Sequence, residues 1–382
     1  MKKKIIVFFV FLLIAVFVVD FYNNFSVMIA GKVQPTDYVI IKWGSSQSEV
    51  GIKGPYENSW YDGPATFDVD KEGNVYVVDY MNNRIIKVDK NSTVVDSIDI
   101  SKITSKDDPN AKYSPIKLIT TDKCMFLLYH YSFLDPTWTA TYPAPPVIYS
   151  KYISIVTKDN IIKIDALKLL GYPVDVYMER LSGDRVVLAP SVPPEDLPTW
   201  KGPKAVIVNC NGETQSIKGL VNGSFDGSTP FATLIFDEDK ENSSYLNTRI
   251  QVKDPKTNRV IFTSGLIDNG KPITYSLGLH FDGNKIAFIY QDANAYNKEN
   301  NSITTHISTF TLFPRKEENY VMVVGNEDRE NMLPPPFAYR VDFVLGQDSY
   351  FYRMVYMTDG LHIQRFEPAA TTTEYFYRSH KL

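Results

Sequence analysis

The sequence is poor in the residues that most often build metal sites or disulfide frameworks. It contains two cysteines and five histidines in 382 residues, and its formal net charge is −4. A weakly acidic chain without concentrated lysine and arginine gives no reason to expect nucleic acid as a partner. Cys124 and Cys210 allow one disulfide in an oxidising compartment, but two separate buried thiols are the favoured expectation.

Helical periodicity is also missing after residue 35. Strand-like runs rich in Val, Ile, Tyr and Phe alternate there with corners of Gly, Asp, Asn and Pro, which is typical of an all-β fold. The sequence has no Gly-x-Ser-x-Gly elbow, no His-Glu-x-x-His helix and no Walker loop. We therefore assign no catalytic residue.

The longest apolar run lies at the N-terminus. Lysines at positions 2–4 precede a run from Ile5 to Val19, and Phe21 and Tyr22 follow. Because positively charged flanks stay in the cytoplasm, the remaining chain is expected outside it. Residues 1–30 are expected to form an uncleaved signal anchor or transmembrane helix that contacts the membrane through residues 5–22. A cleaved signal peptide, giving a secreted protein, is the alternative, although residues 28–30 match the usual cleavage pattern poorly.

A repeated unit organises the rest of the chain. Each copy begins with a proline, continues with an apolar strand, turns at an acidic or glycine corner and resumes with a second strand. The marker prolines are Pro64, Pro115, Pro173, Pro230, Pro272 and Pro336. Residues 37–43 form a strand without a partner of its own, and lending it to the last sheet would close a ring. We predict a six-bladed β-propeller of four-stranded antiparallel blades over residues 36–370, followed by a tail at 371–382.

One copy carries a more specific pattern. Residues 43–95 contain the Gly-Pro of residues 63–64, the turn "DKEGN", the strand "YVVD" and the triplet "NRI". This stretch resembles an NHL repeat, and the weaker copies after it are similar to NHL-like six-bladed propellers in general. The resemblance implies that Asp79 and Arg84 form a structural ion pair at the corner of the repeat.

Long insertions gather at one predicted end of the propeller. They lie before the first strands of some copies and between the second and third strands of others. The aromatic residues in them are Trp60, Tyr61, Trp138, Tyr142, Trp200 and Tyr296. Long loops on a rigid scaffold commonly carry function, and exposed aromatics make good anchors in interfaces. We expect these residues to bind a protein, a glycan or a small molecule; packing over the blade tops is the equal alternative.

The competing hypothesis is a calcium- or zinc-dependent hydrolase or lyase with its site in the central channel, as in some six-bladed propellers. The histidines, which are His130, His280, His306, His362 and His380, are expected to lie apart as surface or packed residues. Asp175 and Asp342 stand on predicted first strands and could face the channel as calcium ligands. No cofactor is predicted, although calcium is possible. A binding or scaffold domain is favoured over an enzyme.

Overall fold

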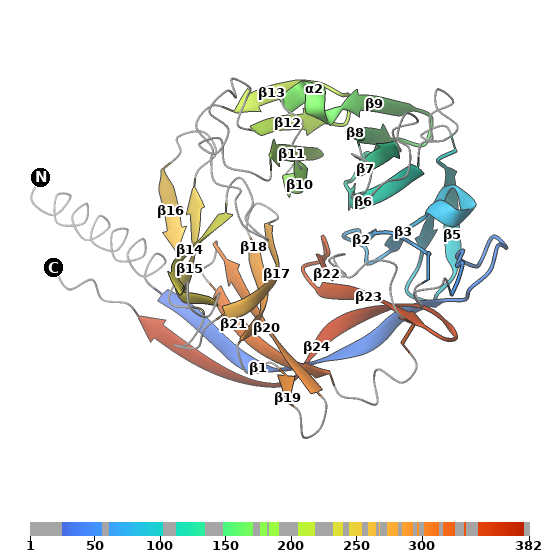
Figure 1. Ribbon diagram of the computed structural model, residues 1–382. Coiled ribbons are helices and arrows are strands. Elements are labelled where there is room, and N and C mark those ends of the chain that lie inside the picture. The colour runs from blue at the N-terminus through green and yellow to red at the C-terminus, as the bar shows by residue number, and fades with distance from the viewer. Residues whose placement is uncertain are drawn as a thin grey trace, which may run out of the picture.

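The strands are arranged as a ring of sheets (Figure 1). The computed structural model of the chain describes residues 25–55, 61–101, 112–133, 148–170, 176–181, 183–190, 205–217, 232–239, 244–253, 259–264, 267, 273–281, 285–292, 296–297, 302–312, 316–324, 332–333 and 343–377. Within them, neighbouring strands of each blade pair antiparallel, and the sheets are arranged around a central axis. The predicted all-β propeller with four-stranded antiparallel blades is confirmed.

Three blades are separate four-stranded sheets. Blade 1 consists of β2 (Phe67–Val69), β3 (Val75–Asp79), β4 (Arg84–Val88) and β5 (Val94–Asp99). Blade 2 consists of β6 (Lys112–Thr120), β7 (Met125–Phe133), β8 (Ile148–Val156) and β9 (Ile161–Asp165). Blade 3 consists of β10 (Val176–Leu181), β11 (Arg185–Pro190), β12 (Ala205–Asn209) and β13 (Thr214–Ile217). The short helices η1 (Tyr80–Asn82) and α2 (Ala166–Leu170) follow β3 and β9.

Two further four-stranded blades belong to one continuous sheet. Blade 4 consists of β17 (Ile273–Phe281), β18 (Lys285–Asp292), β20 (Ser302–Thr311) and β21 (Lys316–Val324), with β19 (Tyr296–Asn297) paired to β20. Blade 5 consists of β22 (Phe343–Leu345), β23 (Phe351–Met357), β24 (Gly360–Tyr377) and β1 (Phe25–Ile41).

The predicted number of six blades is wrong, because the described residues form five four-stranded blades. The copy that begins near residue 229 supplies only β14 (Ala232–Asp239), β15 (Ser244–Lys253) and β16 (Val260–Thr263) within the described part of the chain. Its central strand β15 also pairs with β17, through Tyr245 and Ile273. These three strands therefore extend the sheet of blade 4 and do not make a four-stranded blade of their own.

The chain turns tightly between the first and second strand of a blade. In blade 1 the Asp70 carboxylate accepts hydrogen bonds from the backbone N–H groups of Glu72 and Asn74, at 3.0 and 2.8 Å. Gly73 has φ +82°, which residues with a Cβ rarely adopt. The "DKEGN" segment is thus a side-chain-stabilised turn. We call the end of the propeller that carries these first-to-second-strand turns the hairpin face.

The ring closes through the N-terminal strand, as predicted from residues 37–43. Strand β1 pairs antiparallel with β24, with Asp37 opposite Gln364 and Ile41 opposite Leu361. The pairing is longer than expected, because it includes residues 25–30 and 371–377, which the sequence analysis assigned to the N-terminal segment and the tail. Residues 27–32 of β1 also pair in parallel with residues 316–321 of β21. Strand β1 therefore joins blade 5 to blade 4.

Most of the hydrophobic core lies between successive blades. Ile41 and Tyr352 of blade 5 pack with Phe67 of blade 1, and Phe126 of blade 2 packs with Met178 of blade 3. Each buried aliphatic or aromatic side chain of this size contributes roughly 1.5–3 kcal/mol. The facing surfaces of these neighbouring sheets are thus buried against each other.

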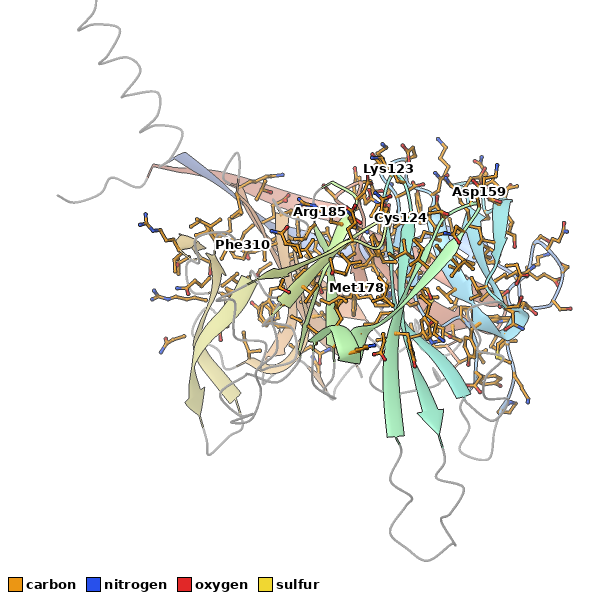
Figure 2. All side chains as sticks on the ribbon, turned by 90° about the horizontal axis from the view of Figure 1, so that it is seen from above. Lys123, Cys124, Asp159, Met178, Arg185 and Phe310 are labelled. Atoms are coloured by element: carbon orange, nitrogen blue, oxygen red, sulfur yellow. A yellow bond between two sulfur atoms is a disulfide. The ribbon has the colours of Figure 1, made fainter. Side chains whose placement is uncertain are left out.

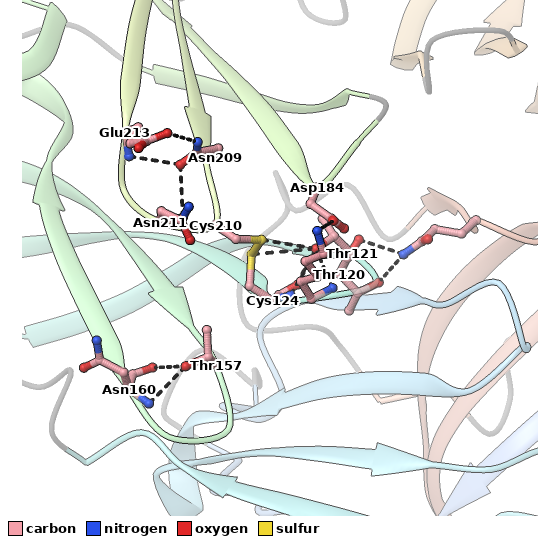
Figure 3. Close-up of a disulfide and its surroundings, with 12 residues drawn as sticks. Thr120, Thr121, Cys124, Thr157, Asn160, Asp184, Asn209, Cys210, Asn211 and Glu213 are labelled. Atoms are coloured by element: carbon pink, nitrogen blue, oxygen red, sulfur yellow. Dashed lines mark hydrogen bonds and ion pairs between the residues drawn. A yellow bond between two sulfur atoms is a disulfide. The ribbon is translucent and has the colours of Figure 1, made fainter.

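A disulfide joins blades 2 and 3. Cys124, in the turn between β6 and β7, is bonded to Cys210, in the turn between β12 and β13, and both lie at the hairpin face (Figure 3). The expectation of two separate thiols is therefore wrong. The turns of neighbouring blades meet there, and sequence spacing alone does not show that.

Within the described part of the chain, no helix is long and apolar enough to cross a membrane. The apolar run of residues 5–19 and the candidate membrane segment of residues 5–22 lie outside that part.

Candidate functional site

Most of the predicted recognition residues lie outside the described residues. These are Trp60, Trp138, Tyr142 and Trp200. Tyr61 is half-buried, and Tyr296 belongs to β19, where it pairs with Ile303 of β20. The common face of these aromatics stays a prediction.

The strands from which two of the long loops leave are described. The connection from Phe133 to Ile148 joins β7 to β8, and the connection from Pro190 to Ala205 joins β11 to β12. Both join a second strand to a third, so they leave from the end of the propeller opposite the hairpin face. In Figure 2 the blades are seen edge-on, with Lys123 and Asp159 in turns at the hairpin face. The two loop-bearing blades are neighbours, and they are the two that the disulfide connects.

Two of the histidines weighed as candidate metal ligands have described side chains. His306 of β20 is stacked on Tyr290, with ring centroids 4.9 Å apart. His362 of β24 is buried, with Nδ1 3.0 Å from Asp37 and Nε2 3.0 Å from Asp359. Both are packed histidines, as expected. Among the described residues, no group of three or more His, Cys, Asp or Glu side chains could hold a metal ion.

The remaining candidates lie elsewhere in the chain. His130 and His280 belong to β7 and β17. His380, Asp175 and Asp342 are outside the described residues.

The structure does bring together a polar network on the first strands. Asp68 of β2 is buried, and its Oδ2 accepts hydrogen bonds from the backbone N–H and the hydroxyl of Thr120, at 2.6 and 2.8 Å. The guanidinium of Arg180 in β10 donates to the same carboxylate oxygen. One carboxylate thus joins the first strands of blades 1, 2 and 3. We call Asp68, Thr120, Arg180 and Gln347 the clasp.

Blade 5 completes the clasp. The Gln347 amide donates to the backbone oxygen and the hydroxyl oxygen of Thr120, at 2.7 and 3.0 Å. The backbone N–H of Gln347 donates to the carbonyl of Val69, at 3.0 Å, and Arg180 Nη1 donates to the carbonyl of Leu345, at 3.3 Å. Side chains from four blades therefore meet near the axis on the side of the hairpin face.

A second ion pair lies beside the clasp. Lys117 Nζ of β6 is 2.6 Å from Glu179 Oε1 of β10. Burial raises the pKa of Glu179, and the Lys117 charge offsets part of that increase. Perturbed carboxylates of this kind occur both at active sites and in structural ion pairs. Here Glu179 is hydrogen-bonded to Lys117 of the neighbouring blade, so the two residues form a structural ion pair.

The predicted corner ion pair is confirmed. Arg84 Nε lies 2.9 Å from Asp79 Oδ2, and Asp79 is fully buried. The other oxygen of Asp79 accepts the backbone N–H of Gly51 at 3.0 Å, and Arg84 Nη2 donates to the carbonyl of Glu49 at 2.6 Å. This ion pair therefore holds residues 49–51, which precede blade 1, in place, and its role is structural.

The clasp was not anticipated from the sequence, although a signal was present. Its charged members interrupt strands that are otherwise apolar, in "FDV" and "VYMERL". A charge on the first strand of a blade is expected to face other first strands around the axis. Which charged residues meet depends on how the blades are arranged around the axis, and the sequence of a single repeat does not determine that arrangement.

Comparisons with known proteins concern the fold alone. No family model and no curated protein matches the chain. Its structure is similar to a streptogramin B lyase structure, with 12% identity, TM-score 0.36, and coverage of 91% of this chain and 99% of that one. It is also similar to a member of the DUF4221 family from Bacteroides vulgatus, with 9% identity, TM-score 0.43, and coverage of 90% and 99%. A virginiamycin B lyase from Staphylococcus aureus aligns with 10% identity, TM-score 0.34, and coverage of 88% and 98%.

Proposed function

We propose that the protein is a membrane-tethered binding or scaffold propeller, NHL-like in type, that presents its loop-rich face outside the cytoplasm. The observation that carries this proposal is the way blades 2 and 3 are fixed to each other. The Cys124–Cys210 bond and the Asp68 carboxylate both connect them at the hairpin face. The long loops with Trp138 and Trp200 leave from the opposite end of the same two blades. Rigid support beneath two adjacent loops favours a preorganised recognition surface.

The location outside the cytoplasm has independent support. Disulfides persist in oxidising compartments and are rare in the cytosol. The charged start and apolar run of residues 2–19 agree with export.

Binding can be tested with the full chain in detergent micelles. Covalent capture of partners and screening against a glycan array would compare the wild type, a Trp138→Ala/Trp200→Ala variant and a Tyr350→Ala variant. Tyr350 is a matched control because it is a 44% exposed aromatic at the hairpin face. The proposal expects the double variant to lose a ligand that Tyr350→Ala retains, with the thermal midpoint unchanged in both.

Two outcomes would contradict the proposal. Equal binding by all three proteins would remove the loop-rich face as the recognition surface. Stoichiometric calcium or zinc in purified protein would instead favour the hydrolase or lyase hypothesis.

A further inference from the structure

The two ends of the described chain lie side by side at the outer edge of the ring. Phe25 of β1 is opposite Tyr377 of β24, followed by Ser26 opposite Phe376 and Val27 opposite Tyr375. Figure 1 shows strands β1 and β24 running side by side along the outside of the propeller. We call residues 25–27 and 375–377 the ribbon end.

The ribbon end is rich in aromatic residues. The last three residues of β24 are Tyr375, Phe376 and Tyr377, and β1 begins with Phe25. The next residues along β24 are of a different kind: Glu374 is acidic, and residues 370–373 are an alanine and three threonines. Tyrosine and other aromatic rings are favoured at the boundary between lipid headgroups and acyl chains. The aromatic composition therefore changes sharply along the same two strands.

The distance to the apolar run is short. The run ends at Val19, and the six residue steps from there to Phe25 span at most about 20 Å. Strand β1 is not a loose linker after this point, because residues 27–32 pair with β24 on one edge and β21 on the other. If residues 5–22 cross the bilayer, the ribbon end must lie close to the membrane surface.

We infer that the ribbon end is a lipid-binding anchor that sits in the headgroup layer of the membrane from which the chain emerges. This inference rests on the proposed tether and adds to it a second contact, made by the propeller itself. Because both strands belong to the closing blade, the contact fixes the edge of the ring against the bilayer. The propeller then stands at a set height and orientation, and the loop-rich face is held in a constant direction relative to the lipid.

The test places one fluorophore at a time along the ribbon of the full chain. Phe376→Cys and Ser26→Cys are opposite each other at the ribbon end, and Thr371→Cys is five residues, about 17 Å, further from it. Each variant is labelled with a nitrobenzoxadiazole maleimide and reconstituted into phosphatidylcholine vesicles. Vesicles with a spin label on the headgroup quench fluorophores at the membrane surface. Quenching at positions 376 and 26 is expected to exceed that at 371 at least threefold, with emission shifted to the blue.

The outcomes separate this inference from the proposed tether. Protein that floats with the vesicles but shows equal, weak quenching at all three positions would overturn the anchor and leave the tether intact. Protein that does not float with the vesicles would overturn both. Ser26→Cys is a small substitution on the partner strand, so a folding defect of Phe376→Cys would not prevent a decision.

Discussion

Arg180 of β10 and Asp68 of β2 form an ion pair between blades that are not neighbours. Blade 2 lies between them and contributes Thr120, whose backbone N–H and hydroxyl donate to the same carboxylate. The Asp68 side chain is 2% exposed. One buried carboxylate therefore connects three blades, and we expect the stability of the hairpin face to depend on it.

Removing that carboxylate charge is expected to destabilise the fold strongly. Asp68→Asn leaves the guanidinium of Arg180 without its counter-charge, and breaking a buried ion pair in this way costs about 3–5 kcal/mol. Chemical denaturation of the full chain in micelles measures the loss. Asp159→Asn, in the exposed turn between β8 and β9, is the matched control and should change the free energy of unfolding by less than about 0.5 kcal/mol. Similar losses in both variants would show that the clasp contributes nothing specific.

The disulfide gives a prediction about location and one about stability. In intact cells neither Cys124 nor Cys210 should react with a maleimide polymer until a reductant is added, which a gel-shift assay detects. The bond closes a loop across a sequence separation of 86 residues, for which the chain-entropy model gives about 4.5 kcal/mol. Cys124→Ala, Cys210→Ala and the double variant should lose the same amount, because each removes the same bond. Free thiols in freshly lysed cells would argue against export.

Acidification is expected to weaken blade 4 through Glu318. Burial alone would raise the pKa of this carboxyl, but hydrogen bonds from Lys316 and Tyr320 outweigh it and hold the pKa below its usual range. Lys316 Nζ and the Tyr320 hydroxyl lie 2.8 Å from Glu318 Oε1. A lowered pKa in the folded state means that the stabilisation is complete above about pH 5 and is lost as the pH falls through the folded pKa.

The measurement is the free energy of unfolding between neutral pH and about pH 3. Glu318→Gln should be less stable than the wild type at neutral pH, by about 1.5–3 kcal/mol, and the difference should shrink on acidification. Glu317→Gln, on the adjacent residue, is the control and should follow the wild-type curve. A difference that stays constant with pH would show that the Glu318 charge is not what stabilises this strand.

Local patterns in the sequence predicted the elements whose causes are local. The turn at Asp70, the Asp79–Arg84 pair and the closing strand at residues 37–43 all follow from residues close together in one repeat or from an unpaired strand. The number of blades could not be predicted in this way. The strand pattern of the sequence continues through β14–β16, but the pairing of Tyr245 with Ile273 joins these strands to the sheet of blade 4. The clasp and the disulfide join residues on different blades, so their partners depend on the closed ring. Recognition by Trp138 and Trp200 stays a prediction because both residues lie outside the described part of the chain.

The closing strand offers the sharpest test of the ring itself. Ile40 and Ile41 are adjacent in β1 and lie opposite His362 and Leu361 of β24, yet Ile40 is 37% exposed and Ile41 only 1%. Side chains alternate between the two faces of a strand, so a slip of one residue would exchange their environments. Ile41→Ala should therefore cost about 2–5 kcal/mol as a truncation in the core, whereas Ile40→Ala should cost less than about 1 kcal/mol. Denaturant unfolding of the two variants compares identical substitutions one position apart. A larger loss of stability in Ile40→Ala would mean that β1 pairs with β24 in the other register. Equal losses would mean that the face of β1 with Ile41 is not buried in the core.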